Sequence, residues 1–138
     1  MVSLDKKNNP TKRALFSSFK DAFSGVKFTF KNERNFRIHT AVTVLVVTAG
    51  FVLKISLLEW TIIVLCIGLV LAMELVNTAI EQTVDLIVGE SFHELARNAK
   101  DAAAGAVVLS AGISVIIGLI IFLPYVWDLF MKLIESII

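Results

Sequence analysis

The chain has 138 residues, 57% of them hydrophobic, with a mean hydropathy of +0.80 and a formal net charge of +1. This length suits a single domain, residues 1–138, and the hydropathy excludes an ordinary soluble domain of this size. The single cysteine, Cys66, excludes an intrachain disulfide and a cysteine metal site.

The N-terminal segment combines basic and aromatic residues. Residues 1–10 are predicted to be a flexible tail, and residues 11–34 an amphipathic helix. In the second segment, apolar residues recur at helical spacing beside lysines and arginines: Leu15, Phe16, Phe19, Phe23, Val26 and Phe30. Such a pattern is typical of a helix that lies on the surface of an anionic membrane, and the alternative is a helix packed against other protein.

Three further segments are apolar enough to cross a bilayer. We predict transmembrane helices over residues 35–55, 57–85 and 100–127, because each contains a long stretch with few charges. The predicted fold class is therefore an all-α membrane protein with an N-terminal surface helix and three transmembrane helices.

The distribution of basic residues predicts the orientation. Residues 1–37 hold nine of the thirteen lysines and arginines, and basic residues beside a span mark the cytoplasmic side. The N-terminus and the 82–101 loop are then expected in the cytoplasm, and the C-terminus outside. We expect no nucleic-acid partner, because the basic segment leads directly into a membrane span.

A polar stripe interrupts the second transmembrane segment. Glu74, Asn77, Glu81 and Asp85 recur every three or four residues and so share one helix face. Ionisable groups inside a membrane are costly, which favours a functional role. The carboxylates could hold a divalent metal, pair with basic residues or carry ions, whereas Asp85 alone fits a solvated residue at the water boundary.

Polar residues from the two neighbouring segments are expected on the same, cytoplasmic side as this stripe. They precede the first and the last transmembrane helix: Glu33, Arg34, Arg37, Glu90, His93, Arg97, Lys100 and Asp101. The glycine-rich nucleotide-binding motifs of soluble proteins are absent from the sequence. These residues therefore predict an acidic, cytoplasm-facing site, without identifying a reaction.

Small residues follow one another at intervals of four in the last segment. They are Ala102, Ala106, Ser110, Ser114 and Gly118. Small residues let membrane helices approach closely, so we predict that this ladder lies against another helix.

Two motifs of the chain resemble the bacterial membrane-integral diacylglycerol kinase family. Residues 74–81, "ELVNTAIE", follow its first hallmark, and residues 93–101, "HELARNAKD", follow its second. The "ERNFRIH" stretch, residues 33–39, is similar to the branch that phosphorylates undecaprenol rather than diacylglycerol. The resemblance implies a homotrimer with sites shared between subunits, and transfer of the ATP γ-phosphoryl group to the hydroxyl of a membrane lipid. Undecaprenol is the favoured acceptor, and diacylglycerol is the alternative.

The resemblance also implies roles for individual residues. Glu74 resembles the general base and contacts the lipid, and Arg37 would lie on the lipid side. Glu33 and Glu81 resemble ligands of the Mg²⁺ ion that accompanies ATP. The implied ATP-binding residues are Glu33, Asn77, Glu81, Glu90, His93, Lys100 and Asp101.

The chain departs from the family pattern in one loop. The spacing from Asp85 to His93 is one residue longer than usual, and Ser91 stands where a glutamate is common. Two other functions stay open from the residues alone. A small cation or proton transporter would explain the intramembrane carboxylates, and a membrane scaffold would explain the ladder of small residues.

Overall fold

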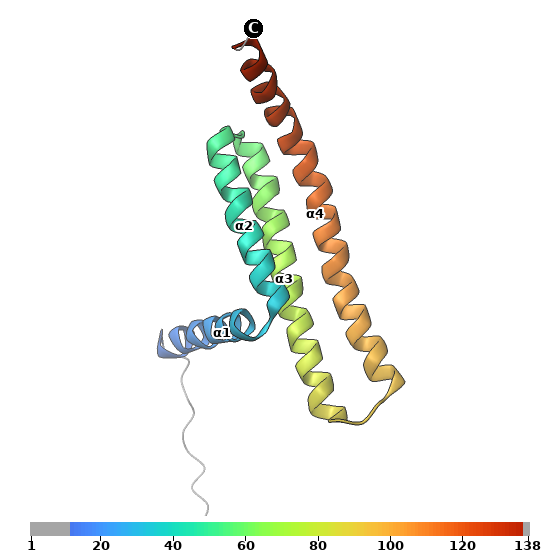
Figure 1. Cartoon of the computed structure of the whole chain (residues 1–138). Coiled ribbons are helices and arrows are strands. Elements are labelled where there is room, and N and C mark those ends of the chain that lie inside the picture. The colour runs from blue at the N-terminus through green and yellow to red at the C-terminus, as the bar shows by residue number, and fades with distance from the viewer. Residues whose placement is uncertain (1–11, 137–138) are drawn as a thin grey trace, which may run out of the picture.

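The computed structural model describes residues 12–136, and side chains from residue 17 onward. The described part forms four helices (Figure 1): α1 Lys12–Asn32, α2 Arg34–Leu53, α3 Leu57–Val88 and α4 Glu94–Glu135. The tail predicted for residues 1–10 lies outside the described residues, as do the side chains of Leu15 and Phe16.

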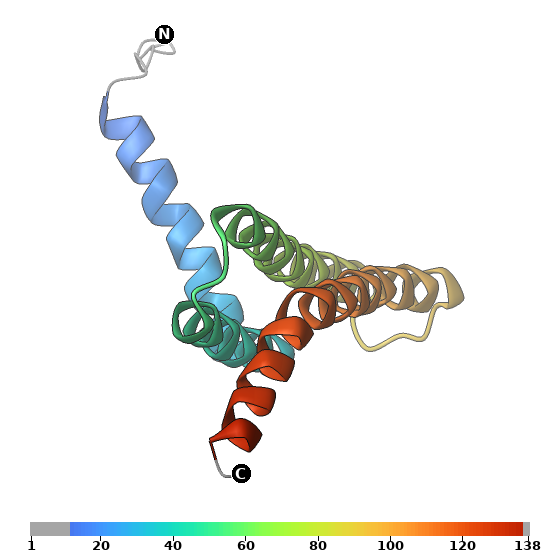
Figure 2. The same ribbon diagram turned by 90° about the horizontal axis from the view of Figure 1, so that it is seen from above.

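Three of these helices are long and apolar enough to cross a membrane, namely α2, α3 and α4. The helix α3 packs against both of the others, most extensively against α4 (Figures 1 and 2). The prediction of an all-helical membrane protein is thus confirmed.

Helix ends differ from the predicted ones most clearly in α4. This helix has 42 residues and continues through Pro124 to Glu135, whereas we expected a segment over residues 100–127. At its start, His93 caps the helix by accepting a hydrogen bond from the backbone N–H of Leu95, at 3.2 Å. The charged residues from Glu94 to Asp101 therefore belong to α4. The prediction placed those before residue 100 in the loop, because it bounded the helix by the spacing of charges.

The turn between α2 and α3 is closely packed. Lys54 adopts a left-handed conformation that ends α2, and Ser56 and Glu59 cap α3 reciprocally. The hydroxyl of Tyr125 donates to Glu59 at 2.7 Å, which ties α4 to this turn. Beside it, Ile55, Ile63 and Ile121 form a small buried core.

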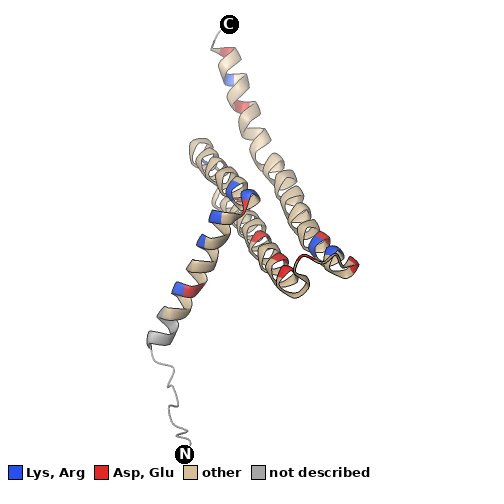
Figure 3. Cartoon of the chain, turned by 60° about the horizontal axis from the view of Figure 1, so that its bottom comes forward, with Lys and Arg blue, Asp and Glu red and all other residues tan. Residues whose placement is uncertain are grey.

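The helix α1 leaves the three-helix bundle at an angle, beside the start of α2 (Figures 1 and 2). Phe19, Phe23, Phe28 and Phe30 are exposed on it, and lysines accompany them along its length (Figure 3). Among the α1 residues whose side chains are described, only Thr29 is buried. It lines a cavity between α1 and α3.

The ladder of small residues in α4 is only partly covered within one chain. Ser110 is buried, with 5% exposure, and its hydroxyl donates to the backbone oxygen of Val107. Ala106, Ser114 and Gly118 are half-buried, whereas Ala102 is exposed. The ladder therefore faces the bundle only near Ser110. Residues four positions apart are offset by about 40° on a helix of 3.6 residues per turn, so the ladder turns away from the bundle toward both ends of α4.

Candidate active site

The centre of the candidate site is the carboxylate of Glu74, on α3. Its side chain is 2% exposed and is the largest fully buried side chain among the described residues. Its Oε1 atom lies 3.3 Å from Nε2 of His39, which comes from α2. A buried carboxylate thus faces an imidazole from another helix, and this partner limits the cost of burying the charge.

The next polar residues of the stripe extend this centre along α3. Asn77 is buried, and its side-chain N–H donates to Oε1 of Glu81 at 3.1 Å. The other side-chain atom of Asn77, Oδ1, is buried and has no hydrogen-bond partner within the described part of the chain. An unpaired buried oxygen is rare in proteins and indicates that a donor or a cation binds there in the working protein.

Glu33 brings a third carboxylate toward the same centre. It forms the junction between α1 and α2, where it is the N-cap residue of α2 without a capping bond from its own side chain. The charges of Glu33 and Glu81 both act on Glu74. Of these carboxylates, Glu81 contacts the buried amide of Asn77 directly, whereas Glu33 acts on Glu74 only through its charge.

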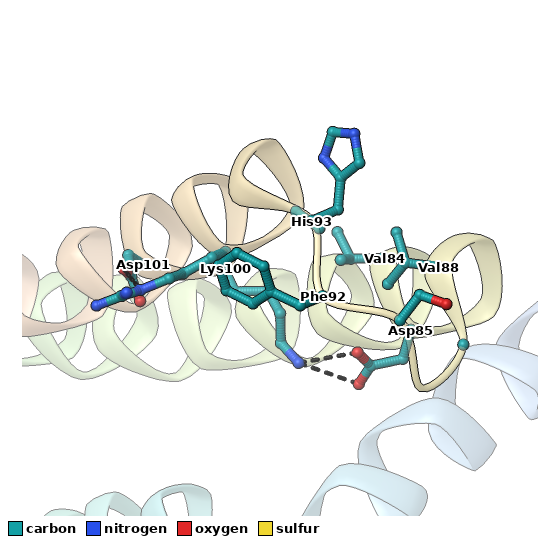
Figure 4. Close-up of a pocket in the computed structure, with 11 residues that line it drawn as sticks. Val84, Asp85, Val88, Phe92, His93, Lys100 and Asp101 are labelled. Carbon is teal, nitrogen blue, oxygen red and sulfur yellow. Dashed lines mark hydrogen bonds and ion pairs between the residues drawn. The ribbon is translucent and has the colours of Figure 1, made fainter.

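A second cluster lies where α3 ends and α4 begins (Figure 4). It surrounds an open pocket of about 400 Å³. Lys100 Nζ contacts both carboxylate oxygens of Asp85, at 2.9 and 3.1 Å. Arg97 and Asp101 pair one turn apart on α4, at 3.5 Å. Asp85 is 60% exposed, as a solvated residue would be, but it is also ion-paired.

The two clusters are electrostatically linked. The charge of Glu81 acts on Lys100 as well as on Glu74, so the stripe on α3 joins the buried centre to the pocket. The structure thus brings together six of the predicted site residues in two neighbouring groups: Glu33, Glu74, Asn77, Glu81, Lys100 and Asp101.

Of the other predicted site residues, His93 lines the pocket, whereas Arg37 and Glu90 are not among its lining residues. Arg37 donates to the backbone oxygens of Phe30 and Lys31, at 3.4 and 3.0 Å, and so holds the end of α1. Glu90 is exposed in the loop, and His93 caps α4 with its ring directed away from the Asp85–Lys100 pair (Figure 4).

Sequence reasoning missed the role of His39. The sequence places this histidine only at the edge of a span, and its contact with Glu74 depends on how α2 and α3 pack. The one available signal was its place at the end of the "ERNFRIH" stretch.

An apolar groove leads away from the buried centre. It has a volume of about 420 Å³ and runs between α2, α3 and α4, from Ile38 and His39 to Phe122. Its lining is almost entirely apolar and belongs to the membrane-spanning helices. Its shape and chemistry suit a hydrocarbon chain.

The oxygen atoms of the site fit a Mg²⁺ ion that is held by few protein ligands, and not a metal ion that is coordinated by protein side chains alone. The described residues contain no group of three or more His, Cys, Asp or Glu that could close around an ion. Mg²⁺ typically uses only one or two carboxylates together with water and phosphate oxygens. Glu81 and the unpaired Oδ1 of Asn77, the residue whose side-chain N–H donates to Glu81, provide such a partial set.

Comparison with known proteins identifies relatives over most of the chain. Residues 20–122 match the family described as prokaryotic diacylglycerol kinase. The chain is 50% identical to the undecaprenol kinase of Bacillus subtilis (strain 168), over 90% of this chain and 98% of that protein. It is 48% identical to a diacylglycerol kinase of Synechocystis, over 80% of this chain and 63% of that protein. Identity to the diacylglycerol kinase of Escherichia coli (strain K12) is 30%, over 69% and 77% of the two chains.

Proposed function

The chain belongs to the prokaryotic diacylglycerol kinase family and is a lipid kinase; from this premise we propose that it transfers the γ-phosphoryl group of ATP to the hydroxyl of undecaprenol, with Mg²⁺. The favoured acceptor follows from the high identity to a relative named undecaprenol kinase. Diacylglycerol is the second candidate, because other relatives carry that name.

The observation that carries the mechanism is a buried carboxylate at the end of an apolar groove. The hydrocarbon chain of the lipid lies along the groove, and its hydroxyl reaches Glu74 beside His39. Glu74 acts as the general base that accepts the hydroxyl proton while the lipid oxygen attacks phosphorus. Arg37, at the start of α2, lies on the lipid side of the site.

The residues toward the loop bind the nucleotide. Lys100 neutralises phosphate charge, Asp101 contacts the nucleotide, and Asn77 orients the phosphates through its free amide oxygen. His93 contributes from the lining of the pocket, and Glu90 from the exposed loop beside it. Phosphoryl transfer depends mainly on such positioning and on neutralising the developing charge.

Glu33 and Glu81 would hold the Mg²⁺ ion. When bound, this ion supplies positive charge that neutralises the phosphate oxygens and fixes their orientation. Glu81 accepts a hydrogen bond from the buried amide of Asn77, and the charge of Glu33 acts on the neighbouring Glu74.

The working unit is a homotrimer whose sites are shared between subunits. A single chain leaves much of the apolar surface of its spanning helices exposed, and its site is open on the side of the loop. The protein lies in the cytoplasmic membrane of a bacterium, with its N-terminus and active site inside and its C-terminus outside. The excess of basic residues before α2 supports this orientation.

A side-by-side assay tests the proposal. Purified protein in mixed micelles is given Mg·ATP with undecaprenol or with diacylglycerol, and phosphorylated lipid is measured. We expect faster turnover with undecaprenol, and turnover lower by about 10² or more in Glu74→Gln. Equal or faster turnover with diacylglycerol would assign the alternative acceptor, and no lipid phosphorylation by the parent protein would refute the proposed reaction.

A further inference from the structure

His39 lies where the apolar groove meets the buried carboxylate. It lines the groove, and its Nε2 atom lies 3.3 Å from Oε1 of Glu74. The two side chains differ in burial, because the exposure of His39 is 24% and that of Glu74 is 2%, and His39 lies in the second turn of α2, near the polar residues at its start. The imidazole therefore stands between the buried carboxylate and the outside of the bundle.

A base as deeply buried as Glu74 must release its proton before it can act again. On its own helix, Thr78 donates to its backbone oxygen rather than to its carboxylate. Two further acidic residues, Glu33 at the α1–α2 junction and Glu81 on α3, act on Glu74 through their charges, and among the described residues His39 is the basic side chain within 4 Å of the Glu74 carboxylate. On α4, Lys100 interacts with Glu81 and is paired with Asp85.

We propose that His39 is the proton relay of Glu74, an inference that rests on the kinase reaction proposed above. As the lipid oxygen bonds to phosphorus and the bond to the ADP oxygen breaks, the hydroxyl proton moves to Glu74. The neutral imidazole then accepts this proton at Nε2 and loses a proton to water. The carboxylate is thereby restored for the next turnover. His39 acts through Glu74 and is a positioning and relay residue rather than the base itself.

The test compares three substitutions in the full-length protein in mixed micelles. His39→Ala removes the imidazole, His39→Gln keeps a polar side chain of similar reach that cannot relay a proton, and Glu74→Gln removes the base. Thr48→Val is the matched control, because Thr48 is an exposed polar residue of the same helix whose hydroxyl bonds only within α2. Turnover, KM for Mg·ATP and thermal stability are measured for each variant, with and without added imidazole.

We expect His39→Ala to lower kcat by at least about tenfold with KM for Mg·ATP unchanged, as loss of acid–base assistance does. Added imidazole should restore a part of kcat in His39→Ala and none in Glu74→Gln. His39→Gln should stay impaired, and Thr48→Val should match the parent.

Three results would overturn the relay. These are normal kcat in a folded His39→Ala protein, full activity of His39→Gln, or a loss in His39→Ala that imidazole does not relieve. Full activity of Glu74→Gln, or no activity of the parent, would instead refute the underlying kinase mechanism, so the two failures are distinguishable.

Discussion

Asp85 and Lys100, fifteen positions apart in the sequence, form an ion pair in which the ammonium group contacts both carboxylate oxygens, at 2.9 and 3.1 Å. The pair joins the last turns of α3 to the first turns of α4 across the loop (Figure 4). It holds a long, flexible lysine side chain at one place beside the pocket. If Lys100 binds phosphate as proposed above, Asp85 would position it for that contact, although no motif assigns Asp85 a role.

Substitution of Asp85 tests this positioning. We expect Asp85→Asn to raise KM for Mg·ATP several-fold with little change in thermal stability, because exposed ion pairs contribute little to folding. The exchange Asp85→Lys with Lys100→Asp restores a pair of opposite charges but removes the cation from position 100. We expect this double variant to fold and to lose nucleotide affinity. Parent-like KM values in both variants would show that the pair is not used for nucleotide binding.

Glu74 and Glu81 share a helix face, but we expect their neutral variants to differ in turnover and in Mg·ATP binding. Glu74 lies two turns, or about 10 Å, further into the span, where a lipid hydroxyl reaches more easily than a triphosphate. Glu74→Gln should lower turnover by about 10² or more and preserve Mg·ATP binding. Glu81→Gln should abolish lipid phosphorylation and also weaken Mg·ATP binding, while the protein stays folded and oligomeric.

Calorimetry of nucleotide binding to both variants checks this division of roles. Equal loss of Mg·ATP affinity in both would mean that the two carboxylates form a single metal site. Near-normal turnover of Glu81→Gln at ordinary Mg²⁺ would remove Glu81 from the metal ligands.

Ser110 tests the packing of α4. The residue is buried and its hydroxyl bonds to the backbone of Val107, so a larger side chain has no free volume. We expect Ser110→Leu to destabilise the protein by about 1–3 kcal/mol through overpacking. Val108→Leu, at the exposed neighbouring position, is the control and should have little effect. Unchanged thermal stability together with unchanged oligomer size on crosslinking would count against a buried Ser110.

Gly50 tests the packing of the α2–α3 turn. A Cβ atom at this position would lie 2.8 Å from the Trp60 ring, which is too close for two carbon atoms, and 3.1 Å from Ile55, which is a tight contact. Gly50→Ala should therefore destabilise the protein by about 1–3 kcal/mol, because the indole has to move. If this contact is the cause, Trp60→Phe should reduce the cost of Gly50→Ala in a double-mutant cycle of thermal unfolding. If the two free-energy changes are simply additive, the contact with Trp60 is not the cause of the destabilisation.

The sequence alone predicted the spanning helices and the polar stripe at which the candidate site is centred. Hydrophobicity and charge are local properties of a segment, so long apolar runs identify α2, α3 and α4 without knowledge of their packing. The stripe from Glu74 to Glu81 also follows from a single helix, since residues three, four and seven positions apart share a face. The two motifs then indicated the family, which the comparisons confirm.

Only the tertiary structure decided which residues from different helices meet. The contacts of His39 with Glu74, of Lys100 with Asp85 and of Tyr125 with Glu59 each join two elements. Transmembrane helices are apolar on nearly every face, so their sequences do not reveal which face turns toward a neighbour or how far one helix slides along another. That rotation and register come from close packing of whole surfaces. In this protein they place a histidine of α2 beside a carboxylate of α3, thirty-five positions further along the chain.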